Sequence, residues 1–285
     1  MASTGDQLSG KEYFWERYFI VYDTLNLSPL YRRLITRHVD LLQPASGDDI
    51  LDAGAGTGNV TELLAVPGAR VTGIDFCTPA LVQCRRKVPS AQFHQADMTQ
   101  PLPFESSSFD KIACSVTLHF LPPERQELAL TELLRVLRPG GQLALSVFNE
   151  GFDAMRIYTE TVRELVHTLG FFRGMWIATR CMVDSALILY YQWRIRRGER
   201  AGIHGYFSAD KLRRTLEKVG FTAVNVETVY AGQCHIAHAA KSVNTYAIYE
   251  APTKGFVEQV YCLQPHADAR NRTTFLLQNA RGDRA

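Results

Sequence analysis

Short apolar runs alternate with amphipathic segments through residues 49–148 of this 285-residue chain. The apolar runs are typical of strands, and the amphipathic segments between them are typical of helices. Alternation at this spacing predicts an α/β fold with a doubly wound parallel sheet, whose ligands bind at the carboxyl ends of the strands. The predicted strands are 49–52, 70–75, 92–97, 109–115 and 142–148, and the predicted helices are about 58–66, 78–87 and 123–137.

The sheet is predicted to resume after a long interruption. A helix over 207–221 is capped by Ser208 and ends at Gly220, and a strand pair follows at 224–230 and 236–240. The result is a Rossmann-like, seven-stranded, mostly parallel sheet whose core spans 45–148 and 204–245. The interruption at 149–203 is predicted to form a helical cap insertion, with an apolar stripe made of Met155, Tyr158, Val162, Leu165 and Leu169.

The two ends of the chain add further segments to this sheet. Residues 11–23 predict a helix with one aromatic face, and residues 29–42 predict another, so residues 1–44 are expected to form an N-terminal helical lid. Residues 246–285 are expected to form a C-terminal extension. Alternation at 256–263 and 273–278 predicts a small hairpin within it.

Composition excludes several classes of protein. A net charge of +2, with no block of Lys and Arg, gives no reason to expect a nucleic-acid partner. The six cysteines are scattered without metal-ligand spacing, which predicts buried thiols in a reducing compartment and no metal. The chain opens without a signal pattern, and its longest apolar region, 175–193, is interrupted by Arg180 and Asp184. We therefore expect a cytoplasmic protein without a transmembrane segment.

A glycine-rich turn follows the first predicted strand. Its glycines are Gly54, Gly56 and Gly58, whereas the dinucleotide fingerprint would need a glycine where this chain has Asn59. Glycines at such a turn allow a positive φ and leave room for a cofactor to touch the backbone. Asp52 precedes the turn and would repel a pyrophosphate. It suits a ligand with an ammonium group, such as the methionyl end of S-adenosylmethionine.

Two more carboxylates end the next two predicted strands. Asp75 ends the second strand, where a carboxylate can accept both hydroxyls of a ribose. Asp97 ends the third strand, where it can accept from an adenine amino group while Met98 offers its backbone amide. Either residue alone could be a loop carboxylate or a helix cap. Three acids on three successive strands, with the glycine turn on the first, favour a cofactor site.

These residues give the chain a clear resemblance. It resembles the class I S-adenosylmethionine-dependent methyltransferases, in the broad group that contains ubiquinone and menaquinone biosynthesis enzymes and natural-product methyltransferases. The resemblance is strong over about 45–150 and weaker over 204–241. The matching blocks are Ile50–Gly58, Val71–Asp75, Gln95–Met98, Leu102–Phe104, Ser108–Asp110, Leu118–Pro122 and Leu134–Gly141, whose Arg-Pro-Gly-Gly turn leads into the fifth strand.

The resemblance implies S-adenosylmethionine as cofactor, with S-adenosylhomocysteine as product. The residues predicted to contact it are Asp52, Gly54, Ala55, Gly56, Asn59, Asp75, Phe76, Asp97, Met98 and Ser115. Because the sulfonium already activates the methyl group, the protein mainly aligns the acceptor and excludes water. His119 is the candidate general base, with packing under the cofactor as its alternative. Tyr18 and Tyr22 either orient the acceptor or belong to an ordinary aromatic core.

Large apolar side chains in the lid and in the cap insertion suit a flat or lipophilic small-molecule acceptor. The alternative is that they pack the cap or an interface between copies of the chain. A basic cluster follows, which either binds an anionic group or a membrane surface or is a solvated helix end. Its members are Arg194, Arg196, Arg197 and Arg200.

Three functions follow from these features. The favoured one is methyl transfer to carbon, oxygen or nitrogen of a lipophilic small molecule in specialised metabolism. An alternative is a quinone or lipid-headgroup methyltransferase at the membrane surface. An alternative of another class is a nicotinamide-dependent oxidoreductase or a cofactor-binding protein that does not methylate.

Overall fold

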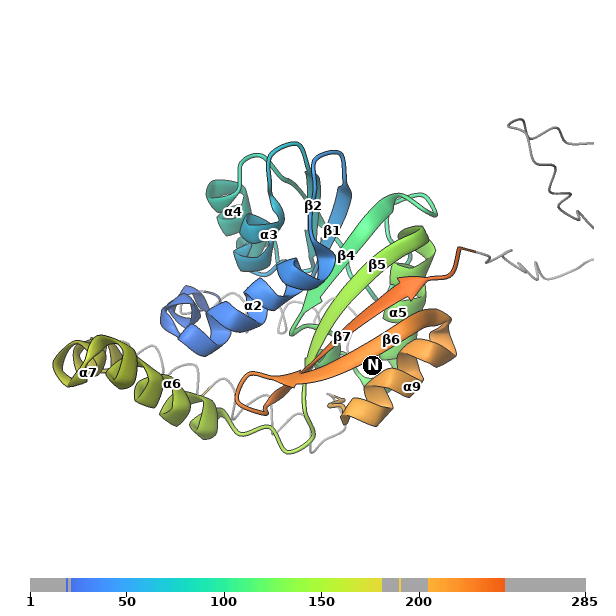
Figure 1. The fold of residues 1–285 in the computed structure, drawn as a ribbon. Helices are drawn as coiled ribbons and strands as arrows, with labels where there is room; N and C mark the ends of the chain where they lie inside the picture. The colour runs from blue at the N-terminus through green and yellow to red at the C-terminus, as the bar shows by residue number, and fades with distance from the viewer. Residues whose placement is uncertain (1–18, 20–21, 181–189, 191–204, 244–285) are drawn as a thin grey trace, which may run out of the picture. The chain divides into compact units, whose positions relative to one another are not determined.

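Seven strands form one sheet in the computed structural model, which describes residues 19, 22–180, 190 and 205–243. The strand order is β3-β2-β1-β4-β5-β7-β6, and β7 runs antiparallel to both of its neighbours (Figure 1). The predicted seven-stranded, mostly parallel sheet is therefore confirmed. The strands are β1 Asp49–Ala53, β2 Arg70–Asp75, β3 Gln92–Gln95, β4 Phe109–Ser115, β5 Leu137–Phe148, β6 Phe221–Val229 and β7 Cys234–Lys241.

Helices cover both faces of the sheet (Figure 1). One face packs against α2 and α3, with α4 beside them over β2 and β3, and the other packs against α5 and α9. The strands between these layers are buried on both sides, which explains why their sequences are continuous apolar runs. The helices are α2 Pro29–Leu42, α3 Asn59–Leu64, α4 Thr78–Lys87, α5 Pro123–Val136 and α9 Ala209–Val219.

Capping residues fix the ends of α2 and α9. The Ser28 hydroxyl accepts from the amide of Tyr31 at the start of α2, and Pro29 occupies the first turn. Ser208 caps α9 in the same way, and Gly220 ends that helix in the left-handed conformation. The predicted helices over 29–42, 78–87 and 207–221 are thus confirmed to within two residues.

Three strand boundaries were predicted wrongly, and one of them is the start of β6, which lies at Phe221 and not at residue 224. The third strand ends at Gln95, because the Asp97 carboxylate accepts from the amide of Thr99 and turns the chain away from β2. Asp97 therefore lies beyond the strand. The fifth strand begins at Leu137, so the Arg-Pro-Gly-Gly segment lies inside it instead of before it. Its residues 138–141 bulge out of register opposite the single residue Asp110, between the pairs Phe109–Leu137 and Lys111–Gln142.

The interruption in the sheet is helical where it is described. It contains α6 Ala154–Leu169 and α7 Phe171–Arg180, two helices that contact each other. The predicted apolar stripe lies on α6, but only its member Leu165 is buried, while Met155 and Leu169 at the two ends are exposed. Most of the predicted lid helix, including Tyr18, lies outside the described residues, as do residues 246–285 and their predicted hairpin. No described helix is long and apolar enough to cross a bilayer.

Candidate functional site

The strand order reverses between β1 and β4, and the glycine turn leaves β1 at this point. Gly54, Gly56 and Gly58 have φ values of +79°, +54° and +85°, so the predicted need for a positive φ is confirmed. In a doubly wound sheet the carboxyl ends of the strands at this reversal border the ligand crevice. The short segment η2 (Leu118–Phe120), which follows β4, borders the same end of the sheet.

A side chain of the protein occupies the space where each glycine of the turn would otherwise carry its Cβ. A Cβ on Gly54 would meet the Thr117 side chain, with Cγ2 only 2.5 Å away. A Cβ on Gly56 would lie 3.2 Å from the Phe19 ring, and one on Gly58 would lie 3.2 Å from Cys84 Sγ. The glycines therefore first allow the chain to pack tightly around the turn.

Asp52 is a buried carboxylate with spare bonding capacity beneath this turn. It is 1% exposed, and its Oδ2 accepts a 2.6 Å hydrogen bond from the Thr61 hydroxyl. Its Oδ1 has no hydrogen-bond partner among the described residues. Burial raises the pKa of Asp52 to about 6. An acceptor left this way inside a protein costs free energy, which a cationic ligand would recover.

Asp75 connects the end of β2 to the glycine turn. Its Oδ2 accepts from the amide of Gly56 and its Oδ1 from the amide of Cys77, both at 2.9 Å. Burial raises the pKa of Asp75 to about 6. The backbone of Phe76 also hydrogen-bonds to this carboxylate, so three of its four lone pairs are used and one stays open to a hydroxyl donor. Asp75 thus shapes the turn in addition to any contact with a ligand.

Further residues predicted to contact the cofactor lie around this edge in different settings. Asp97 is partly exposed, whereas Met98 is buried in the large core cluster beneath α5. Ala55 is buried, and its amide donates to Ile74 at the end of β2. Phe76 is partly buried after β2, and Ser115 is partly buried at the end of β4. Their contact with a cofactor stays a prediction.

The side chain of Asn59 is occupied by the protein. Its oxygen accepts from Asn26 at 2.9 Å and from Lys87 at 2.6 Å, and its amide donates to the Tyr31 hydroxyl at 3.3 Å. Lys87 also pairs with Asp23 at 2.9 Å. Sequence reasoning did not select Lys87, and it gave Asp23 no role at the site.

His119 is enclosed by aromatic rings. Its ring centroid lies 4.1 Å from that of Phe120, 4.5 Å from that of Phe148 and 5.4 Å from that of Tyr206. The ring is fully buried, and Nδ1 accepts from the amide of Phe148 at 3.4 Å. This setting favours the packing interpretation over a general base.

Tyr22, the other described candidate for catalysis, lies among tyrosine and phenylalanine side chains. Its hydroxyl accepts from the Tyr31 hydroxyl at 3.3 Å, and its ring makes edge-on contacts with Phe19 and Tyr31. These contacts favour the aromatic-core interpretation, and a role in orienting the acceptor stays a prediction.

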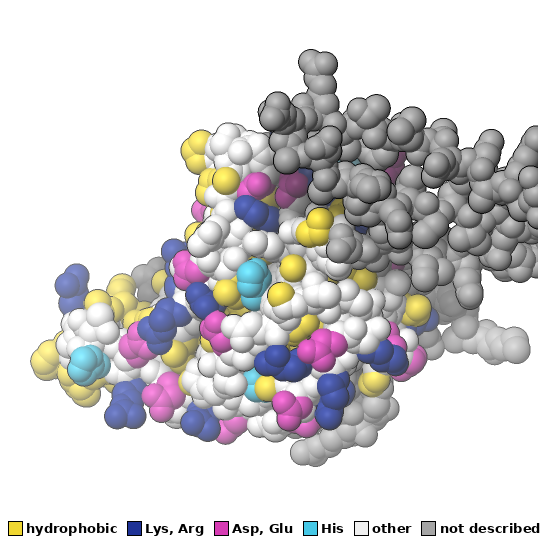
Figure 2. Space-filling view, turned by 45° about the vertical axis from the view of Figure 1, so that its right-hand side comes forward, with side chains coloured by type: hydrophobic (Ala, Val, Ile, Leu, Met, Phe, Trp, Pro, Cys, Tyr) yellow, Lys and Arg dark blue, Asp and Glu magenta, His cyan; other side chains and the backbone are white. Residues whose placement is uncertain are grey.

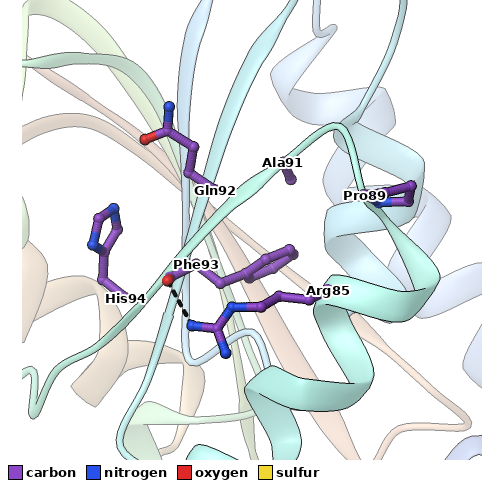
Figure 3. Close-up of a pocket in the computed structure, with 6 residues that line it drawn as sticks. All are labelled: Arg85, Pro89, Ala91, Gln92, Phe93 and His94. Carbon is purple, nitrogen blue, oxygen red and sulfur yellow. Dashed lines mark hydrogen bonds between the residues drawn. The ribbon is translucent and has the colours of Figure 1, made fainter.

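A hollow of about 440 Å³ lies at the edge of the sheet (Figure 3). It is lined by the last part of α4 and by β3, and Arg85 donates to the carbonyl of Phe93 beside it. None of the residues predicted for the cofactor lines it. The described residues also contain no group of three His, Cys, Asp or Glu side chains that could hold a metal.

Comparison with known proteins shows which family this chain is similar to. The family described as "Methyltransferase domain" matches residues 51–145, which include the glycine turn and all three carboxylates. A demethylmenaquinone methyltransferase of Renibacterium salmoninarum is 28% identical over 79% of this chain and 87% of its own. Another, of Beutenbergia cavernae, is 36% identical over 47% of this chain and 54% of its own.

Solved structures agree with this match in fold. The N-methyltransferase NodS of Bradyrhizobium japonicum, in complex with S-adenosylhomocysteine, superposes with a TM-score of 0.53 at 18% identity, over 76% of this chain and 90% of its own. This chain is a class I S-adenosylmethionine-dependent methyltransferase. A Thermotoga maritima methyltransferase structure has a TM-score of 0.54 at 16% identity, over 81% of this chain and 99% of its own. The family match and the relatives named as methyltransferases identify S-adenosylmethionine as the cofactor, so the nicotinamide alternative is set aside.

Proposed function

We propose that this methyltransferase transfers the donor's methyl group to a lipophilic small molecule, and that Asp52 receives the donor's ammonium group. The unpartnered Oδ1 of Asp52 carries this proposal, because a buried carboxylate oxygen beneath the turn fits a cation and repels a phosphate. When bound, the cofactor supplies an already activated methyl group. The chain's own task is to hold donor and acceptor in line and to exclude water.

We assign the binding of donor and acceptor to different segments of the chain. Residues 45–148 and 204–245 would bind the donor, while the lid at 1–44 and the insertion at 149–203 would enclose the acceptor. Phe19 supports this arrangement, since its ring packs directly on the donor turn at Gly56. No general base is assigned, because His119 is engaged in packing.

Asp75→Ala is expected to weaken the binding of S-adenosylhomocysteine by about 1.5–3 kcal/mol, as the loss of charge-assisted hydrogen bonds would. The proposed ribose would lose its hydroxyl acceptor, and the turn would lose its bond at Gly56. Isothermal titration calorimetry measures the change. Asp210→Ala, at an exposed position in the first turn of α9, is the control and should leave the affinity unchanged. An unchanged affinity in Asp75→Ala would place the ribose elsewhere.

A quinone-type acceptor at a membrane surface is the second candidate, favoured by an exposed apolar tip where α6 meets α7. Phe171 is 63% exposed and Phe172 is 87% exposed, with Leu169 and Trp176 beside them. Figure 2 shows hydrophobic side chains on the lobe at its left, together with basic and acidic ones. Such a surface fits shallow insertion into an anionic bilayer. Relatives described as demethylmenaquinone methyltransferases support the same class of acceptor.

The double variant Phe171→Ser/Phe172→Ser is expected to bind vesicles that contain anionic lipid at least about tenfold more weakly, since each inserted aromatic ring contributes more than 1 kcal/mol. Co-sedimentation measures this binding. Leu128→Ser, at an exposed leucine on α5, is the control. Transfer of a labelled methyl group to a naphthoquinol in the same vesicles tests the acceptor. Wild-type protein that stays in the supernatant and methylates only dispersed acceptors would refute the membrane candidate.

A further inference from the structure

Lys87, the last residue of α4, lies between two segments that are distant in sequence. Its Nζ donates to Oδ1 and Oδ2 of Asp23 at 3.0 and 2.9 Å and to Oδ1 of Asn59 at 2.6 Å. Asp23 opens the short segment η1 (Asp23–Leu27) before α2, whereas Asn59 is the first residue of α3. The Lys87 side chain is four-fifths buried, so these contacts are only partly screened by water.

The same segment before α2 meets the donor turn at three successive points. The Phe19 ring packs on Gly56, Asp23 Oδ1 accepts a 2.6 Å hydrogen bond from the Thr57 hydroxyl, and Asn26 donates to Asn59. These contacts reach from Gly56 and Thr57 in the turn to Asn59 at the start of α3. The conformation of the turn is therefore coupled to the seating of this segment.

The charges around the turn explain why a lysine is needed there. Asp23, Asp52 and Asp75 all act electrostatically on Cys84, the α4 residue packed against Gly58, and so does Lys87. Three carboxylates thus share one neighbourhood, and their repulsion would push Asp23 away from the turn. Lys87 neutralises Asp23 by direct contact and leaves Asp52 without a partner for its Oδ1.

We propose that Lys87 is a positioning residue that, through Asp23, fastens the segment η1 onto the donor turn and thereby slows the release of the donor and its product. This inference rests on the donor site proposed above. Lys87 acts through Asp23 and Asn59 and does not itself touch the donor. Its effect is expected on the dissociation rate, because the fastened segment must loosen before the turn can release its ligand.

The test compares the dissociation of S-adenosylhomocysteine from the wild type, Lys87→Met, Asp23→Asn and the double variant. Each single variant is expected to release the product about tenfold faster, with little change in association rate. The double variant should be no faster than the single ones, because both remove the same ion pair. Lys218→Met, which removes an exposed pair with Glu127 on α5, is the control and should match the wild type.

Salt separates fastening from a general loss of stability. Wild-type release should accelerate between about 0.01 M and about 1 M salt as the Debye length shrinks from about 30 Å to about 3 Å, and release from Lys87→Met should accelerate less, because it keeps only the buried contact of Asp52 with the ligand. Multiplicative effects in the double variant, or wild-type rates in Lys87→Met, would overturn the role of Lys87. A wild-type protein that binds no S-adenosylhomocysteine would instead overturn the donor site itself.

Discussion

Asp52→Asn is expected to weaken the binding of S-adenosylhomocysteine by about 3–5 kcal/mol at pH 8, the scale for removing one partner of a buried ion pair. Asparagine keeps the shape of the side chain and an oxygen that can accept from Thr61, but it leaves the ligand's ammonium without a counter-charge. Isothermal titration calorimetry measures the loss. Asp40→Asn, at an exposed position on α2, should bind the product as the wild type does.

The pH dependence of binding checks the same assignment. Burial raises the pKa of Asp52 and of Asp75 to about 6, and a cation binds the ionised form. Affinity in the wild type should therefore rise from about pH 5 to about pH 7, with release of protons on binding. The increase of affinity with pH should be smaller in Asp52→Asn, because of these two carboxylates only Asp75 is left to titrate. Affinity of that variant within twofold of the wild type at pH 8 would refute the ammonium contact.

The stability of the ligand-free protein should respond in the opposite direction. Because the pKa of Asp52 is raised, the native state holds a proton between about pH 4 and about pH 6 that the unfolded chain has lost. This group's contribution to stability therefore falls as the pH rises through that window. Burial lowers the pKa of His38 to about 4, which makes its contribution rise instead. The free energy of unfolding of the wild type and of Asp52→Asn should therefore be measured across this pH range. The difference between the two curves gives the contribution of the Asp52 carboxylate.

Gly54→Ala is expected to destabilise the protein by about 2–5 kcal/mol, the sum of a left-handed backbone penalty and an overpacking penalty. The backbone at Gly54 has a φ of +79°, and the added Cβ would meet the Thr117 side chain. Urea denaturation followed by circular dichroism measures the loss. Binding of S-adenosylhomocysteine should fall as well, because the turn must shift to relieve the clash.

Gly232→Ala separates the two penalties. Gly232 has a φ of +80°, but its Cβ would enter open space, so only about 1–2 kcal/mol should be lost. The double variant Gly54→Ala/Thr117→Gly should recover part of the difference between the two alanine variants. Equal losses of unfolding free energy in the two alanine variants would show that the Thr117 side chain moves aside without an energetic cost.

Local signals predicted most of the sheet and its helices. Ser28 and Ser208 act within one helical turn, and the apolar runs of β1, β2 and β4 reflect burial on two faces. The start of β5 was missed because residues 138–141 bulge out of its register with β4, and the end of β3 was missed because the Asp97 side chain competes with the sheet. Both strand ends depend on hydrogen-bond partners, which the spacing of apolar residues along the chain does not reveal.

The candidate site divides in the same way. The glycine turn and Asp52 are adjacent in sequence, and Asp75 follows at the end of the next strand, so their convergence could be predicted from strand order alone. Lys87 and Asp23 are separated by 64 residues, and their pairing depends on how α4 and the segment before α2 meet. No local pattern carries that information. The aromatic enclosure of His119 likewise draws on Tyr206, from beyond the cap insertion.

The packing of Thr117 against Gly54 also constrains how this chain can diverge. The two positions are 63 residues apart, yet they share one small volume at the edge of the sheet. A homologue with a residue larger than glycine at position 54 is expected to carry a residue smaller than threonine at position 117. Covariation between these two positions in an alignment of relatives would therefore be evidence for this contact that is independent of the denaturation experiments.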